Sequence, residues 1–183
     1  MKILFINSCV RENSRTLSHS KAYLNKYCAD DIIGEVNISS KNLLPLNAKT
    51  IKERENDISK QNLTEDKYAL AYEFASADKI VVAAPFWDFS FPSMLRVYIE
   101  QIAVNGITFG YPHGVPTGYC MAEELVYITT AGGYIGENSS LEHYLNELCA
   151  MFGIEKLTFI KAEGLDITGN NPDEILNTAI LKL

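Results

Sequence analysis

Hydroxyl and guanidinium groups gather directly after an apolar segment at the start of the chain. The segment KILFIN is followed by SCVRENSRT, whose groups of these two kinds belong to Ser8, Arg11, Ser14, Arg15 and Thr16. Hydroxyl donors, guanidinium groups and the free N–H groups at the start of a helix together favour a phosphate. The loop has neither the GxGxxG nor the GxxxxGKS/T pattern, so it supports neither a dinucleotide loop nor a P-loop. A terminal phosphate monoester suits it better, although Ser and Thr also cap helices that bind nothing.

Aromatic residues crowd a second segment, PFWDFSFP at residues 85–92, which follows the β-branched run KIVVAA. Phe86 and Trp87 stand on one side of Asp88 there, and Phe89 stands on the other. Exposed aromatic side chains after a central strand suit the faces of a flat apolar ring system, for example an isoalloxazine. Burial against a neighbouring subunit would also explain these side chains, and the two roles are compatible.

A third segment, TTAGGYIG at residues 129–136, is small and rich in glycine. Gly132 and Gly133 would let the backbone approach a ligand closely, because they carry no side chain. A double glycine alone is better explained by an ordinary tight turn. Its coincidence with the other two segments is what makes it informative.

The elements that position these segments alternate along the chain. Short apolar runs predict buried strands, and apolar residues at helical spacing predict helices. The predicted strands are residues 2–7, 32–38, 79–84, 125–130 and 157–162, and the predicted helices are 14–27, 64–77, 92–103, 139–152 and one from Pro172 onward. Thr64 is expected to cap the second helix, and Pro92 to be the first residue of the third. Residues 39–62 are predicted to be a partly helical excursion over the surface.

Five alternations of strand and helix predict a doubly wound α/β fold, with a parallel sheet and helices on both faces. The three unusual segments follow the first, third and fourth predicted strands. In such a sheet, ligands bind outside the carboxyl ends of the strands, where the strand order reverses. The three segments are therefore expected to form one site.

The chain resembles the flavodoxin-like FMN-dependent NADH-quinone and azo-compound reductases over nearly its whole length. Ser8 followed by Ser14-Arg15-Thr16 is similar to that family's phosphate loop. The segment PFWDFSFP resembles its P-x-x-N-F-x-x-P pattern, and TAGG resembles its turn of Ser or Thr, any residue and two glycines. Leu44-Pro45-Leu46 is similar to an apolar-proline element of the family. The resemblance implies a flavodoxin-like five-stranded parallel sheet, with residues 1–183 as a single FMN-binding domain.

The resemblance also implies a set of FMN-binding residues. Ser8, Ser14, Arg15 and Thr16 would hold the phosphate. The isoalloxazine would be lined by Pro85, Phe86, Trp87, Asp88 and Phe89 and closed on its other edge by Thr130, Ala131, Gly132 and Gly133.

The implied reaction passes hydride from NADH or NADPH through FMN to a quinone or an azo or aromatic acceptor, in a two-electron, ping-pong sequence. It requires no catalytic side chain and no metal, because the flavin carries the chemistry. The family is a homodimer with flavin at the interface, so residues 92–103 would lie near the partner. A one-electron flavodoxin and a non-catalytic flavin-binding protein are the alternatives. The helix from Pro92 and the following GITFGYPHG favour a substrate pocket and a dimer over an exposed flavin edge.

The chain departs from the family at several positions. Asp88 stands where Asn is usual, and its carboxylate would lower the flavin potential if it faced the ring. Tyr134 and Ile135 occupy the region where the family often places a His. His143 is expected on a helix surface instead. Cys9 could have a lowered pKa beside a helix start, but a small residue filling a turn is the simpler interpretation.

Composition limits the function of this 183-residue chain. A net charge of −7 and a pI near 5.0 argue against a nucleic-acid surface, which needs a basic face. No apolar run approaches the ~20 residues of a membrane span, and the N-terminus does not resemble a signal peptide. The four cysteines lack metal-type spacing, and in a cytosolic protein they would be reduced. We therefore expect a cytoplasmic protein that binds neither nucleic acid nor membrane.

Overall fold

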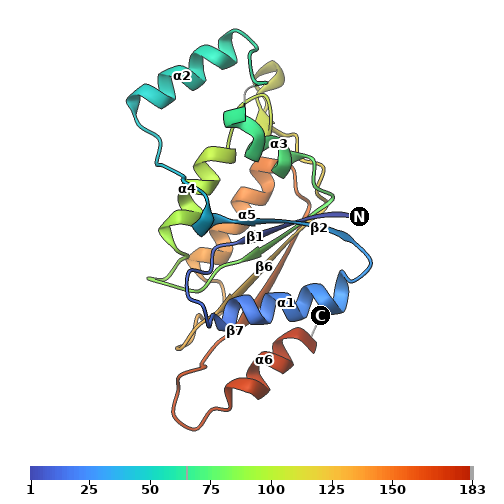
Figure 1. The fold of residues 1–183 in the computed structure, drawn as a ribbon, viewed down its shortest axis with the longest axis vertical. Coiled ribbons are helices and arrows are strands. Elements are labelled where there is room, and N and C mark those ends of the chain that lie inside the picture. The colour runs from blue at the N-terminus through green and yellow to red at the C-terminus, as the bar shows by residue number, and fades with distance from the viewer. Residues whose placement is uncertain (65, 182–183) are drawn as a thin grey trace.

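A computed structural model describes residues 1–64 and 66–181 of the chain, and it contains a central five-stranded parallel sheet (Figure 1). The strands are β1 (Lys2–Asn7), β2 (Ile32–Asn37), β3 (Lys79–Ala83), β6 (Glu124–Thr130) and β7 (Lys156–Ala162). Their spatial order is β2-β1-β3-β6-β7, and every neighbouring pair is parallel. This is the flavodoxin-like order, with its switch point between β1 and β3. The predicted strands and the doubly wound fold are confirmed.

Two layers of helices bury the two faces of the sheet (Figure 1). Helices α3 (Ala69–Ala75), α4 (Ser93–Ile102) and α5 (Ser140–Phe152) cover one face, while α1 (Arg15–Tyr27) and α6 (Pro172–Leu181) lie on the other. Alternate strand residues point to opposite faces. Leu4 and Tyr127 accordingly join the core under α3–α5, and Phe5 and Val126 join the core under α1. Among the described residues, no helix has the length and apolar character needed to cross a membrane.

Capping residues mark where several helices begin and end. Ser14 caps α1 by accepting a hydrogen bond from the Leu17 N–H at 3.2 Å. Ser139 caps α5, which ends at Gly153 in the left-handed conformation with φ 79°. Pro92 lies immediately before α4, as its N-cap rather than its first residue.

The prediction of one helix over residues 64–77 is wrong. The structure has a short 3₁₀ turn, Asp66–Tyr68, followed by α3, whose N-cap is Tyr68. Thr64 therefore does not cap α3. Glu65, which a helix over residues 64–77 would place in its first turn, lies outside the described residues.

The excursion after β2 is partly helical, as expected, and projects from the body as α2 (Ala48–Ser59) (Figure 1). Polar contacts anchor α2. Arg54 donates hydrogen bonds to the carbonyl oxygens of Glu100 and Ala103 at the end of α4, at 3.0 and 3.3 Å. The Tyr68 hydroxyl donates to the Asp57 carboxylate at 2.7 Å.

A small hairpin that the sequence did not predict joins α4 to β6. Its strands are β4 (Phe109–Gly110) and β5 (Thr117–Gly118). It packs against the end of α5, where a Cβ on Gly118 would come within 2.0 Å of the Gly153 nitrogen. The end of α5 leads to the start of β7, so the hairpin lies at the amino end of the sheet. Within one chain the segment GITFGYPHG therefore lies away from the carboxyl end of the sheet, and its expected role in a pocket and a dimer stays a prediction.

Candidate functional site

The three segments that follow β1, β3 and β6 converge on a single cavity at the carboxyl end of the sheet. Its volume is about 380 Å³. It is lined by Val10, Arg11, Asn13, Ser14, Arg15, Thr16, Pro85, Phe86, Trp87, Thr130, Ala131, Gly132, Leu165 and Asp166. Nine of the thirteen predicted site residues are thus brought together. Ser8, Asp88, Phe89 and Gly133 are not among the lining residues.

The segment after β1 supplies hydrogen-bond donors at the start of α1. Thr16 is buried, and its hydroxyl lies 2.6 Å from that of Thr130, which links this segment to the one after β6. Ser8 is also buried, and its Oγ finds no hydrogen-bond partner among the described residues. The first N–H groups of a helix have no partner within the helix and carry partial positive charge. This end of the cavity therefore suits an anion.

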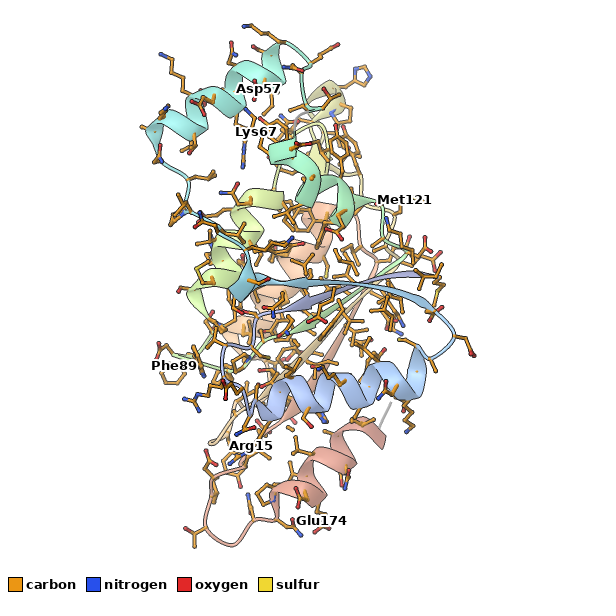
Figure 2. The ribbon with its side chains drawn as sticks, viewed as in Figure 1. Arg15, Asp57, Lys67, Phe89, Met121 and Glu174 are labelled. Atoms are coloured by element: carbon orange, nitrogen blue, oxygen red, sulfur yellow. The ribbon has the colours of Figure 1, made fainter. Side chains whose placement is uncertain are left out.

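Two arginines reach the same cavity. Arg11 lies over the Trp87 ring, with its Cζ 5.7 Å from the ring centroid. Arg15, at the beginning of α1 (Figure 2), forms an ion pair of 2.7 Å with Asp166. Both guanidinium groups strengthen the preference for an anion.

The aromatic segment after β3 makes a tight turn. Trp87 and Ser90 exchange two backbone hydrogen bonds, of 3.1 and 2.8 Å, around Asp88 and Phe89, which both have positive φ. This is the geometry of a type I′ turn, and neither of its middle residues lines the cavity. Phe89 is 82% exposed and lies at the outer edge of the molecule (Figure 2). The cavity therefore receives Phe86 and Trp87, while Asp88 is exposed.

The glycine turn after β6 is held by the segment after β7. Leu165 and Asp166 donate backbone hydrogen bonds to the carbonyl oxygens of Ala131 and Gly132, at 3.1 and 3.0 Å. A Cβ on Gly132 would lie 2.4 Å from an Asp166 carboxylate oxygen, so a side chain there would force that exposed carboxylate to move. The Glu163 carboxylate accepts hydrogen bonds from the N–H groups of Ile135 and Gly136, which fixes the rest of the turn.

Sequence reasoning missed the contribution of the segment after β7. Leu165 and Asp166 line the cavity, as do Val10 and Asn13 after β1. The rule that ligands bind at the carboxyl ends of parallel strands applies to the fifth strand as well, and it could have pointed to Leu165 and Asp166.

Cys9 and His143 have no direct place in the cavity. Cys9 is buried, and burial raises the pKa of its thiol more than the hydrogen bond with Ser14 lowers it. The thiol is therefore a packed, protonated group and not a reactive thiolate. His143 is exposed on α5. Among the described residues, no group of three or more His, Cys, Asp or Glu could hold a metal ion.

Comparison with known proteins identifies the family. A family model described as a flavodoxin-like fold matches residues 1–183. An FMN-dependent NADH:quinone oxidoreductase 2 of Clostridium acetobutylicum is 34% identical over 193 residues, covering 99% of this chain and 95% of the relative. An FMN-dependent NADH:quinone oxidoreductase of Clostridium beijerinckii is 37% identical, with the same coverage. The chain belongs to the FMN-dependent NADH:quinone oxidoreductase family.

Solved structures agree with this family in fold. An azoreductase from Bacillus anthracis superposes with a TM-score of 0.84 at 21% identity, covering 100% of this chain and 96% of the other. A FMN-dependent NADH-azoreductase from Bacillus anthracis, solved in complex with FMN, gives 0.82 at 22% identity, with coverage of 100% and 95%. The oxidoreductase family and these azoreductases therefore share one architecture, and the cavity lies at its switch point.

Proposed function

We propose that this chain is an FMN-dependent NAD(P)H oxidoreductase that reduces quinones or azo and other aromatic acceptors. One observation carries the proposal. A single cavity combines hydroxyl and guanidinium donors at the start of α1 with the aromatic side chains after β3. Relatives that match the chain over nearly their full lengths bear the name FMN-dependent NADH:quinone oxidoreductase.

The chain's residues fit the phosphate end of FMN. Ser14, Thr16 and the free N–H groups of α1 would bind the phosphate oxygens, and Arg11 and Arg15 would neutralise their charge. Ser8 belongs to the same segment, and its buried Oγ has no hydrogen-bond partner among the described residues. It does not line the cavity, so its contact with the phosphate stays a prediction.

The residues also fit the ring end. Phe86 and Trp87 would flank the flavin ring and exclude water, and Gly132 would let the backbone come close to the ring edge. Pro85, Thr130 and Ala131 complete the same wall. Asp88 is exposed and does not line the cavity, so we expect its carboxylate to have little effect on the flavin potential.

Bound FMN would supply the redox chemistry, a two-electron, ping-pong transfer of hydride from NADH or NADPH to the acceptor. The protein's own residues bind and orient, and no nucleophilic side chain is required. We further propose that residues 1–183 act as one domain in a cytoplasmic homodimer. The partner subunit would then complete the site. Phe89 and Gly133, which do not line the cavity of one chain, would contribute to this completed site.

The visible spectrum of the FMN-loaded protein, recorded anaerobically before and after addition of NADH or NADPH, tests the activity. Bleaching of bound flavin, followed by recovery on addition of a quinone, is expected. A yellow protein that neither nucleotide bleaches would favour a one-electron carrier or a non-catalytic flavin-binding protein. A protein that retains no flavin would contradict the site itself.

The phosphate end is tested by replacing both Ser14 and Thr16 with Ala. FMN affinity should fall about tenfold to a hundredfold, because two donors near the phosphate are lost. Ser18→Ala is the matched control, since Ser18 lies exposed on the same helix. Unchanged FMN affinity in the double variant would remove the phosphate assignment.

A further inference from the structure

Asp166 is an acidic residue in a cavity that otherwise favours anions. Of the described residues that line this cavity, two are arginines and only Asp166 carries a negative charge. A carboxylate beside a phosphate site weakens phosphate binding, because like charges repel. Its presence there needs a physical explanation.

The backbone fixes Asp166 at this place. Its N–H donates to the Gly132 carbonyl oxygen at 3.0 Å, and its neighbour Leu165 donates to Ala131 at 3.1 Å. The carboxylate leans over the glycine turn, where Gly132 has no Cβ to obstruct it. From that position it reaches Arg15 at the start of α1, 151 residues earlier in the chain.

The ion pair between Arg15 and Asp166 is short but exposed. The Nη1–Oδ1 distance is 2.7 Å, and the two side chains are 48% and 65% exposed. Exposed pairs of this kind contribute at most about 1 kcal/mol to stability. A phosphate dianion offers a guanidinium two charge-assisted hydrogen bonds, so it can take Arg15 from Asp166 at little cost.

We propose that Asp166 is a counter-ion for Arg15 that lowers the affinity of the site for the phosphate group of its cofactor. This inference rests on the proposed function, since it names what regulates the same site. Asp166 holds Arg15 at the cavity while no phosphate is bound, and phosphate must displace it. The residue is therefore a positioning residue that sets how strongly the chain distinguishes FMN from riboflavin, which lacks the phosphate.

Affinity measurements with the two flavins test this proposal. Trp87 is the only tryptophan of the chain and lines the cavity, so quenching of its fluorescence reports binding. Asp166→Asn keeps the shape of the side chain and removes its charge. At low ionic strength, FMN should bind about threefold to tenfold more tightly to this variant, while riboflavin affinity stays within about twofold. Asp173→Asn, at an exposed acid with the same change in net charge, should leave both affinities unchanged.

A double-mutant cycle with Arg15→Gln tests the route of the effect. If Asp166 acts through Arg15, the gain from Asp166→Asn should shrink markedly once Arg15 is gone. An undiminished gain would show that the carboxylate acts on the phosphate directly, which would overturn the counter-ion role.

The remaining outcomes separate this inference from the proposed function. Weaker binding of both flavins by Asp166→Asn would mean that the carboxylate contacts the shared part of the cofactor, or supports the fold, and would overturn the inference alone. Unchanged FMN affinity would do the same. A wild-type chain that binds neither flavin would overturn the proposed function together with this inference.

Discussion

The two ends of the parallel sheet differ in how completely their polar groups are paired. At the amino end, the partly buried Glu124 carboxylate forms ion pairs of 2.7 Å with both Lys79 and Lys156. It also accepts a hydrogen bond of 2.6 Å from the Thr158 hydroxyl. At the carboxyl end, the buried Ser8 Oγ has no partner, and Arg11 has no carboxylate partner among the described residues.

This difference suits one end of the sheet to stability and the other end to ligand binding. Polar groups that satisfy one another stabilise the fold and have little left to offer a ligand. Groups left unmatched at a fixed place are costly to the empty protein but ready to bind. The paired groups at the amino end therefore stabilise the sheet. The unmatched groups at the carboxyl end can bind an anion and an aromatic ring.

Removal of the Glu124 charge should destabilise the fold at the amino end of the sheet. Glu124→Gln leaves the partly buried Lys79 without its counter-charge, so the free energy of unfolding should fall by about 2 kcal/mol. Denaturant unfolding measures this change, and flavin affinity should stay the same because the site lies at the other end. Glu123→Gln, at the exposed neighbouring residue, should leave stability nearly unaltered. Equal effects of the two substitutions would show that the charge cluster does not stabilise the sheet.

Low pH should also reduce the stability that Glu124 gives to the amino end of the sheet. Partial burial opposes ionisation of Glu124, but hydrogen bonds from Lys156, Lys79 and Thr158 outweigh it and lower its pKa from 4.5 to about 2. A lowered carboxyl pKa gives stability that is full above the unfolded-state pKa and is lost as pH falls through the folded-state pKa. The free energy of unfolding should therefore decline between about pH 4.5 and about 2. Glu124→Gln should remove that part of the slope, and an identical slope in both proteins would contradict the pKa shift.

Removal of the Trp87 indole should show which part of the flavin each side of the cavity binds. Trp87→Ala should weaken FMN and riboflavin alike by about tenfold, because a ring contact does not depend on the phosphate. Flavin absorbance after ultrafiltration measures both affinities. Trp87→Phe should recover most of the loss, since it keeps an aromatic face. A loss confined to FMN would instead assign Trp87 to the phosphate end, through its contact with Arg11.

Phe89→Gly should change the free energy of unfolding by the smallest amount. Phe89 has φ 61°, which is unfavourable for a bulky residue, so Phe89→Gly should raise the free energy of unfolding by about 0.5 kcal/mol. Gln61→Gly, at φ 54° far from the cavity, should give a similar gain without altering flavin binding. Thermal unfolding measures both. A lower melting temperature for Phe89→Gly would show that packing of the ring in the proposed dimer outweighs the backbone strain at this position.

The sequence predicts those parts of this structure that depend on local chemistry. The runs at β1, β3 and β6 are apolar and bounded by polar turns, so their places follow from the pattern alone. The segments after them are unusual enough in composition to mark the site. Ser14 and Ser139 are recognisable caps, because a hydroxyl before an apolar-periodic run is a helix signal.

The remaining features depend on contacts between distant segments. Asp166 enters the cavity because its backbone pairs with the glycine turn, which no local pattern encodes. The turn at Asp88 and Phe89 lacks the glycine that usually marks a type I′ turn. The strands of the β4–β5 hairpin have two residues each, too few to show a period. Its place at the amino end follows from the contact between Gly118 and Gly153.

The wide sequence separation of the cavity walls constrains when the protein can take up its cofactor. Thr16 meets Thr130 across 114 residues, and Arg15 meets Asp166 across 151. A nascent chain that has left the ribosome only as far as β3 presents the first segment without the glycine turn that faces it. We therefore expect cofactor capture to wait until synthesis has passed the glycine turn at Gly132 and Gly133. Flavin cannot template the early steps of folding, and its loading is a late event in the life of each molecule.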